Sequence, residues 1–261
     1  PADWTWPLVT DQQELTFGNG EVVPVVPGSE KHSYVGFEQI DTVIEDEATH
    51  TLAQSVMPDD SIATYCDQLA RDACAILYET PDDFHFRPRH IRLRYVEALL
   101  DSDGNPTQST LNIKKNDLPI ITLTRRAFEG KRIASSLTFA MAYLYQNLTG
   151  SKVTDQTARN TTIGINVFIR IELGYLTSAN RPNGGGARWD ENRFTAGFFF
   201  HYIVHDAPTP SPNFVKDLNK QFNRRIHGDR VWTKDLITEI NARRMTVDEL
   251  WTEYKAWVAN Q

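Results

Sequence analysis

The stretch Lys131 to Gly150, KRIASSLTFAMAYLYQNLTG, decides the fold. Its apolar residues recur three and four positions apart, and Gly150 is a typical stop signal for a helix. Residues 134–148 contain no charged side chain, although 23% of the whole chain is charged. The stretch therefore predicts a helix that is buried on most of its circumference.

Two further apolar stretches of helix length follow: Thr161 to Leu176 (TTIGINVFIRIELGYL) and Arg188 to Val204 (RWDENRFTAGFFFHYIV). Upstream, the sequence predicts a capped helix from Pro58 to about Tyr78 and strands over residues 91–96 and 118–123. These elements together predict an α+β fold, with a small N-terminal mixed sheet packed on a mainly helical C-terminal half. A functional site is expected between the three apolar helices.

No internal repeat and no interdomain linker is visible, so we expect a single domain over residues 1–261. Within it we expect an N-terminal arm or hairpin over residues 1–35, a helix plus sheet over 59–130, and a helical core over 131–261. The hairpin is predicted around Gly18-Asn19-Gly20. Residues 36–57 fit either a helix or a strand-turn-strand.

Five segments of the second half share their order and spacing with one known family. They are Gln146 at the end of the first helix; Ile163-Gly164-Ile165 with Phe168-Ile169-Arg170-Ile171; Trp189-Asp190; Phe214-Val215 with Leu218-Asn219-Lys220; and Val247-Asp248-Glu249-Leu250-Trp251 with Tyr254-Lys255. In these segments the chain resembles the plant basic secretory protein family, a group of secreted proteins with a zincin-like peptidase signature. The resemblance implies a zincin-like fold and an origin in the secretory pathway.

The chemistry of that family does not carry over to this sequence. In the same alignment the two zinc histidines fall on Phe139 and Tyr143, and the catalytic glutamate falls on Ala140. The acidic residues of the second helix fall on Ile163 and Val167. Zinc needs imidazole or anionic ligands, and peptide hydrolysis needs a base that activates the metal-bound water. We therefore expect the scaffold of a peptidase without its metal, and no other cofactor.

If the cleft of the family persists, aromatic and apolar side chains line it, and few polar groups stand among them. Such walls suit a small hydrophobic molecule. The predicted catalytic residues are Tyr143, Arg193 and His201, and the predicted substrate-binding residues are Phe139, Gln146, Ile163, Asn166, Val167, Trp189, Phe194 and Phe198. The same bulky residues could instead fill the cleft, and the sequence leaves both alternatives open.

An apolar pocket lowers the barrier of a cyclisation or cycloaddition by orientation alone, without a strong base or a metal. Tyr143 or Arg193 could polarise a carbonyl group of the substrate. The sequence therefore predicts a pericyclase-type enzyme of secondary metabolism. The alternative is a secreted, non-catalytic pseudo-peptidase that binds a ligand, a glycan or a protein. An active zinc peptidase with rearranged ligands ranks last.

His201 and His205 stand four residues apart in HYIVH, so both imidazoles share one face of a helix and suit a metal. No third ligand is evident in the sequence, because Asp206 would face elsewhere on a helix. Tyr202 stands where a base-bearing glutamate would be expected. We therefore predict no metal at these histidines.

Composition bounds the partners and the compartment. The net charge of −7 gives no basic surface for nucleic acid. The sequence contains no run of about 18 apolar residues, so no membrane span is predicted.

Asn147 and Asn160 begin sequons, which would be glycosylated in a secretory or extracellular protein. Cys66 and Cys74 stand roughly 12 Å apart on one predicted helix, beyond the reach of a disulfide. The oligomeric state stays open.

Overall fold

The structure is a computed structural model that describes residues 14–24, 37–80, 83–84, 86–147, 156–228 and 230–261. The chain divides into two compact units, one formed by residues 1–75 and 87–145 and the other by residues 76–86 and 146–261. The single domain expected from the sequence stays a prediction. Trp4 and Trp6 of the predicted N-terminal arm, and the predicted helix stop Gly150, lie outside the described residues.

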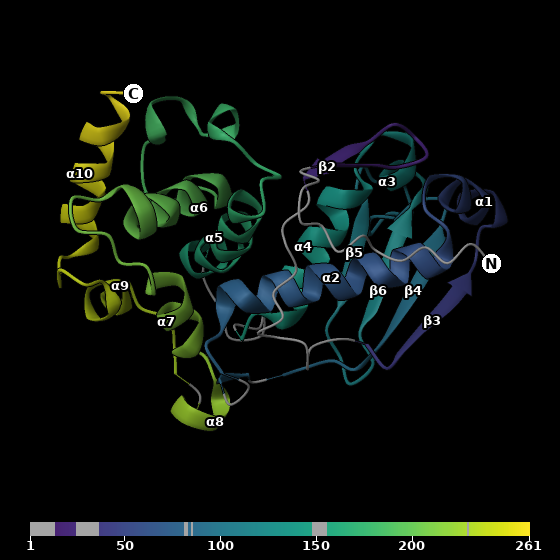
Figure 1. Cartoon of the computed structure of the whole chain (residues 1–261), viewed down its shortest axis with the longest axis horizontal. Coiled ribbons are helices and arrows are strands. Elements are labelled where there is room, and N and C mark those ends of the chain that lie inside the picture. The colour runs from purple at the N-terminus through teal and green to yellow at the C-terminus, as the bar shows by residue number, and fades with distance from the viewer. Residues whose placement is uncertain (1–13, 25–36, 81–82, 85, 148–155, 229) are drawn as a thin grey trace. The chain divides into compact units, whose positions relative to one another are not determined.

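The first unit contains a four-stranded mixed sheet in the order β3-β4-β6-β5 (Figure 1). Strand β4 (His90–Val96) runs parallel to both of its neighbours, β3 (Gln39–Ile44) and β6 (Ile120–Thr124). Strand β5 (Leu111–Lys114) pairs antiparallel with β6. Both predicted strands are confirmed. The edge strand β5 was not predicted, because four residues are too few to carry a periodic signal.

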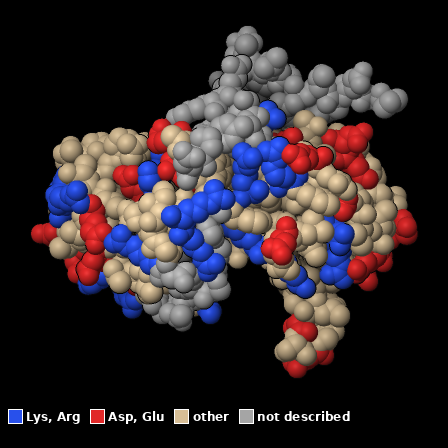
Figure 2. Space-filling view, turned by 90° about the horizontal axis from the view of Figure 1, so that it is seen from below, with Lys and Arg blue, Asp and Glu red and all other residues tan. Residues whose placement is uncertain are grey.

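Charged side chains on the exposed face of this sheet pair across the strands. Arg94 on β4 donates two hydrogen bonds of 2.6 Å to Glu45, which follows β3, and His90 lies 2.9 Å from Asp41 on β3. Figure 2 likewise shows acidic and basic side chains close together over much of the face that it presents. The basic residues of β4 are therefore matched by carboxylates.

Two smaller elements precede and flank the sheet. Strands β1 (Glu14–Thr16) and β2 (Val22–Pro24) form the predicted hairpin. Residues 36–57 hold strand β3 and then helix α1 (Glu47–Val56), so neither predicted arrangement is correct. The strand gives way to a helix because the carboxylate of Asp46 accepts a 2.8 Å hydrogen bond from the Thr49 amide and caps α1.

The remaining helices of this unit include both long predicted ones. Helix α2 (Asp59–Leu77) carries Cys66 and Cys74, which are buried and free, as expected. A short helix, α3 (Arg125–Glu129), follows β6 and leads into α4 (Ile133–Tyr145). All residues of α4 are buried except Ser135, Phe139 and Tyr143, which stand four positions apart. The predicted buried helix is thus confirmed, with one half-buried stripe along it.

The second unit is helical in its described part. It contains α5 (Gln156–Glu172), α6 (Arg193–His201), a π-helical turn (Tyr202–Asp206), α7 (Phe214–Lys220), α8 (Arg224–His227), α9 (Asp235–Ile240) and α10 (Val247–Val258). Short 3-10 turns at Ser178–Asn180 and Asn183–Gly185 lie in the Gly-rich segment between α5 and α6. The sheet of the first unit and these helices confirm the α+β class.

Aromatic rings form the core of the second unit. Phe199 on α6 meets Trp251 on α10 edge-on, with ring centroids 5.4 Å apart, and packs on Tyr254 at 5.6 Å. Helix α10 opens with a capping box, in which Thr246 and Glu249 bond reciprocally to each other's backbone amides. Among the described residues, no helix combines the length and the apolar character that crossing a bilayer requires.

Candidate functional site

Three tryptophans of the second unit border a cavity of about 480 Å³, here termed the three-tryptophan pocket. Its lining residues are Arg188, Trp189, Asp190, Trp232, Thr233, Lys234, Asp248 and Trp251. Ligand pockets in proteins commonly measure roughly 300–1,000 Å³ and are mostly apolar with a few polar groups. The size and the lining of this cavity fit that description.

The aromatic walls are fixed by packing. The rings of Trp189 and Trp232 lie 6.3 Å apart at 55°, and each indole is only 7% exposed. Trp189 also packs on Phe199, which supports Trp251 from behind. Because all three indoles rest on the aromatic core, their orientation does not depend on a ligand.

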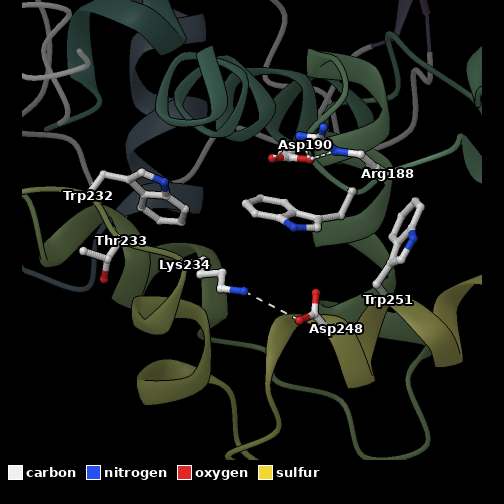
Figure 3. A pocket seen from close by; sticks show the side chains of 8 residues that line it. Arg188, Asp190, Trp232, Thr233, Lys234, Asp248 and Trp251 are labelled. Carbon is white, nitrogen blue, oxygen red and sulfur yellow. Dashed lines mark hydrogen bonds and ion pairs between the residues drawn. The ribbon is translucent and has the colours of Figure 1, made fainter. Parts of the chain in front are cut away.

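Two ion pairs border the pocket on opposite sides of the space between Trp232 and Trp251 (Figure 3). Arg188 donates two 3.0 Å hydrogen bonds to the carboxylate of Asp190, and Lys234 lies 3.6 Å from Asp248. The Arg188 side chain is 71% exposed and Lys234 is 61% exposed. The Asp248 side chain is 76% exposed as well, and exposed ion pairs contribute little to stability, so Lys234 can turn to a bound ligand at small cost. The Asp190 side chain is only 9% exposed, so its pairing keeps Arg188 in place at the edge of the pocket.

Polar contacts hold the segment that carries Trp189 and Asp190. The main-chain oxygen of Asp190 accepts a 2.7 Å hydrogen bond from the amide of Asn160 on α5. Asn192 then caps α6, and its side chain accepts from the amides of Phe194 and Thr195. The segment is therefore anchored at both ends to helices of the same unit.

The predicted site residues on α4 belong to the first unit. The rings of Phe139 and Tyr143 stack in parallel, with centroids 6.3 Å apart at 9°. The ammonium group of Lys115 lies 5.9 Å from the Tyr143 ring centroid and donates to the main-chain oxygen of that residue. Burial lowers the pKa of Lys115 to about 7. No sequence pattern predicted a role for this lysine, which lies between the short strands β5 and β6.

Three of the predicted site residues lie on α5. Val167 is buried against Gly197 of α6, and Asn166 is buried as well. Ile163 is half-buried. Gln146, next to α4 in sequence, is 1% exposed. None of these four side chains lines the three-tryptophan pocket.

The predicted residues on α6 lie apart from one another. Phe198 and His201 border a second cavity of about 220 Å³, together with Arg181 and Trp257. Arg193 is exposed at the start of the helix, with its guanidinium 5.2 Å from the ring of Phe194. Trp189 therefore borders the three-tryptophan pocket, whereas Phe198 and His201 border the other cavity. Arg193 borders neither of the two.

Both predicted glycosylation sites are buried and bonded. Asn147 is 3% exposed, and its amide donates to the main-chain oxygens of Asp83 and Asn219. Asn160 is 7% exposed and donates to Asp190, as described above. A glycan on either amide nitrogen would require that these contacts be given up.

The chain was compared with known protein families, curated proteins and solved structures. A family model described as BSP, peptidase of plants and bacteria, matches residues 32–254. No curated protein and no solved structure matches the chain. The match spans both units.

Proposed function

The chain belongs to the BSP family, described as peptidase of plants and bacteria, and we propose that it uses the scaffold of that family for a function other than proteolysis. In this proposal the protein binds a small hydrophobic molecule in the three-tryptophan pocket and promotes the cyclisation of that molecule. The single observation that carries the proposal is the pocket itself, whose indole walls are fixed by packing and whose rim carries two cations, Arg188 and Lys234.

Helix α4 supports the loss of proteolysis. The resemblance places the zinc histidines of the family on Phe139 and Tyr143, and these residues lie on the only stripe of α4 that is not buried. No His, Asp or Glu stands anywhere on this helix. Rings and one phenol do not fit a zinc ion, which takes imidazole, thiolate or carboxylate ligands. This face of α4 therefore lacks the metal ligands and the base that peptide hydrolysis by a zinc enzyme requires.

The lining of the three-tryptophan pocket favours a ligand with flat apolar faces and at least one oxygen-rich group. Indole rings bury such faces over large areas and tolerate a polar neighbour through their N–H group. Arg188 and Lys234 offer hydrogen-bond donors from two sides of the pocket. Each is paired with a carboxylate, Asp190 or Asp248, so the charges of the lining balance. A carbonyl or carboxylate group on the ligand matches these donors.

Cyclisation suits a pocket of this kind. An intramolecular cycloaddition turns two π bonds into two σ bonds and needs no oxidant, reductant or leaving group. Holding the reacting ends in contact supplies much of the rate enhancement, and a cation beside a carbonyl supplies more. Arg188 or Lys234 takes the polarising role here, which the sequence had assigned to Tyr143 or Arg193.

A second candidate is a non-catalytic function, in which the same pocket holds a glycan or a protein side chain. Tryptophan and arginine are enriched where proteins make their strongest contacts, so the lining fits this use as well. Product formation separates the two candidates. A ligand that binds and returns chemically unchanged supports the second.

The binding step is tested with anilinonaphthalene sulfonate, a fluorescent probe that combines aromatic rings with an anion. We expect saturable binding to the full chain and quenching of tryptophan fluorescence. Trp251→Leu removes a wall of the pocket and should weaken binding at least about tenfold. Trp257→Leu is the matched control, because Trp257 is half-buried on the same helix but lines the other cavity.

Two results would contradict the proposal. One is a wild-type chain that does not bind the probe, or binds it equally well after Trp251→Leu. The other is cleavage of casein that a chelator abolishes, since this would show a working metallopeptidase.

The cyclisation step is tested next. Ligands that bind are incubated with the protein, and a product of unchanged mass but altered retention time indicates cyclisation.

A further inference from the structure

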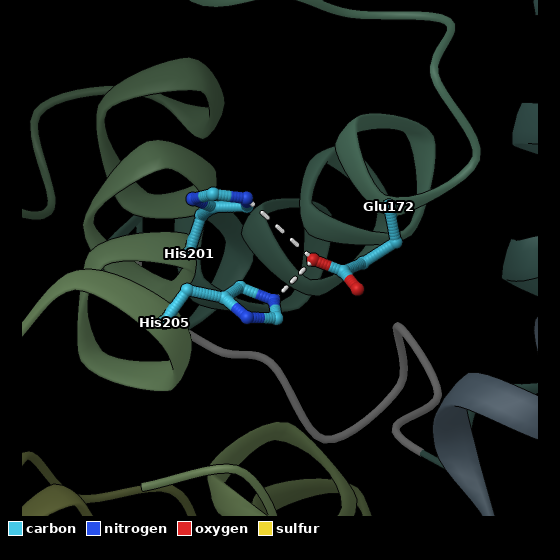
Figure 4. A group of neighbouring side chains, drawn as sticks. All are labelled: Glu172, His201 and His205. Atoms are coloured by element: carbon cyan, nitrogen blue, oxygen red, sulfur yellow. Dashed lines mark hydrogen bonds and ion pairs between the residues drawn. The ribbon is translucent and has the colours of Figure 1, made fainter. Parts of the chain in front are cut away.

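Two histidines and a glutamate converge beside the packed helices α5 and α6 (Figure 4). Glu172 ends α5, His201 ends α6, and His205 lies in the π-helical turn that follows. One ligand atom of each residue lies within 4.8 Å of the other two. Over the part of the chain that the structure describes, no other group of three such side chains is found.

The distances fit a tetrahedral metal site. Oε1 of Glu172 lies 2.7 Å from Nε2 of His205 and 3.6 Å from Nε2 of His201. Around a zinc ion with bonds near 2.1 Å, ligand atoms stand roughly 3.4 Å apart. The two observed distances lie on either side of this value, so small side-chain rotations would bring both imidazoles and the carboxylate into place.

Asp206 completes an arrangement that is usual around metal-bound histidines. Its Oδ2 lies 3.4 Å from Nδ1 of His201, the ring nitrogen that points away from Glu172. A ligating histidine commonly gives its second N–H to a carboxylate, which fixes the ring and its tautomer. Asp206 is therefore placed to orient His201 rather than to bind the ion.

The π-helical turn explains why the sequence concealed this arrangement. On an α-helix, a residue five positions on faces elsewhere, so Asp206 was expected to point away from His201. The turn instead bonds at a spacing of five, as in the 2.9 Å hydrogen bond from the Ala207 amide to the Tyr202 oxygen. The expectation for Asp206 was therefore wrong. Turns of this kind within α-helices are frequent at functional sites.

The surroundings of the two histidines are partly apolar and leave room for water. Burial and the neighbouring His205 lower the pKa of His201 below its usual value, although Glu172 and Asp206 act in the opposite direction. The ring of Phe168 lies under both histidines, with centroid distances of 6.3 and 6.5 Å. The side chains of Glu172, His201 and His205 are 24, 31 and 43% exposed, so solvent reaches the site.

We propose that Glu172, His201 and His205 bind a zinc ion, with a water molecule as the fourth ligand and Asp206 as the residue that positions His201. Two imidazoles and one carboxylate with an open position form a ligand set that suits zinc. This site uses none of the α4 positions at which the resemblance places the zinc ligands of the family. It also lies outside the lining of the three-tryptophan pocket.

The test measures zinc binding directly. The full chain is stripped with a chelator, dialysed and titrated with zinc chloride by calorimetry, and cobalt(II) absorption reports the coordination geometry. We expect one zinc ion per chain and a tetrahedral cobalt spectrum. Glu172→Gln and His205→Ala should each weaken zinc binding at least about 100-fold, and Asp206→Asn about 10- to 100-fold.

His90→Ala is the matched control. His90 also lies beside a carboxylate, at 2.9 Å from Asp41, but has no second histidine in contact. Its loss should leave zinc affinity unchanged, and circular dichroism checks that every variant is folded. The proposal is overturned if the wild-type chain binds no zinc, if Glu172→Gln and His205→Ala bind zinc as well as the wild type, or if His90→Ala weakens binding equally.

Discussion

Gly197 on α6 and Val167 on α5 pack so closely that a side chain at position 197 has no room. A Cβ atom built there would stand 2.6 Å from Cβ of Val167 and 3.1 Å from the main-chain oxygen of Gly164. A Cβ atom built at position 164 would likewise stand 2.7 Å from Cβ of Ala196. The two helices therefore approach through small residues, and this approach holds Glu172 near His201 and His205.

Gly197→Ala should destabilise the protein, although alanine favours a helix more than glycine does. The propensity gain is about 1 kcal/mol, whereas forcing a methyl group into this contact costs roughly 1–3 kcal/mol and separates the helices. Urea denaturation followed by circular dichroism measures the net change. The double variant Val167→Ala with Gly197→Ala should recover part of the loss, because it returns space to the contact. A Gly197→Ala variant more stable than the wild type would show that the helices are not this close.

Asp72 on α2 should make stability depend on pH. Its side chain accepts a 2.8 Å hydrogen bond from Gln68, yet burial raises its pKa to about 7, from 3.8. The folded state therefore keeps a proton that the unfolded chain loses, so this group reduces stability as pH rises from about 4 to 7, and fully above that. Asp72→Asn keeps the shape without the charge.

The stability advantage of Asp72→Asn over the wild type should grow between about pH 5 and pH 8, to as much as roughly 2–4 kcal/mol. Urea denaturation at both values measures it, and the value at the lower pH serves as the internal control. An advantage that is the same at both values would mean that the buried carboxylate is already ionised near its usual pKa.

The sequence predicted those elements whose signal is local. The uncharged run of α4 and the alternation of β4 each report burial directly, and Thr246 with Glu249 is a local pattern as well. Strand β5 was missed because its four residues are too few to show a periodic pattern. Helix α1 was missed because the apolar pattern of residues 36–57 fits both a helix and strands. Family resemblance added the positions on α4, of which Phe139 and Tyr143 lie on its half-buried stripe.

Neither candidate site could be assembled from the sequence, because each joins residues far apart in the chain. Trp232 stands in a polar segment without periodicity, and nothing local connects it to Trp189 or Trp251. Glu172 is separated from His205 by 33 positions, and their 2.7 Å contact follows only from the packing of α5 on α6. The π-helical turn has no sequence signature of its own, so Asp206 could not be placed.

Asn147 provides a last prediction, on glycosylation. Its amide nitrogen donates to two main-chain oxygens at 3.0 and 3.1 Å, and its side-chain oxygen accepts from the hydroxyl of Tyr78 at 3.1 Å. A sugar on this nitrogen would remove one donor hydrogen and require a path to solvent, leaving buried carbonyl groups without partners at about 1–3 kcal/mol each. We therefore expect folded protein from a secretory host to carry no glycan at Asn147, despite its sequon. Mass spectrometry of the peptide before and after enzymatic deglycosylation measures occupancy. A folded chain that is fully glycosylated at Asn147 would show that this buried network is not formed.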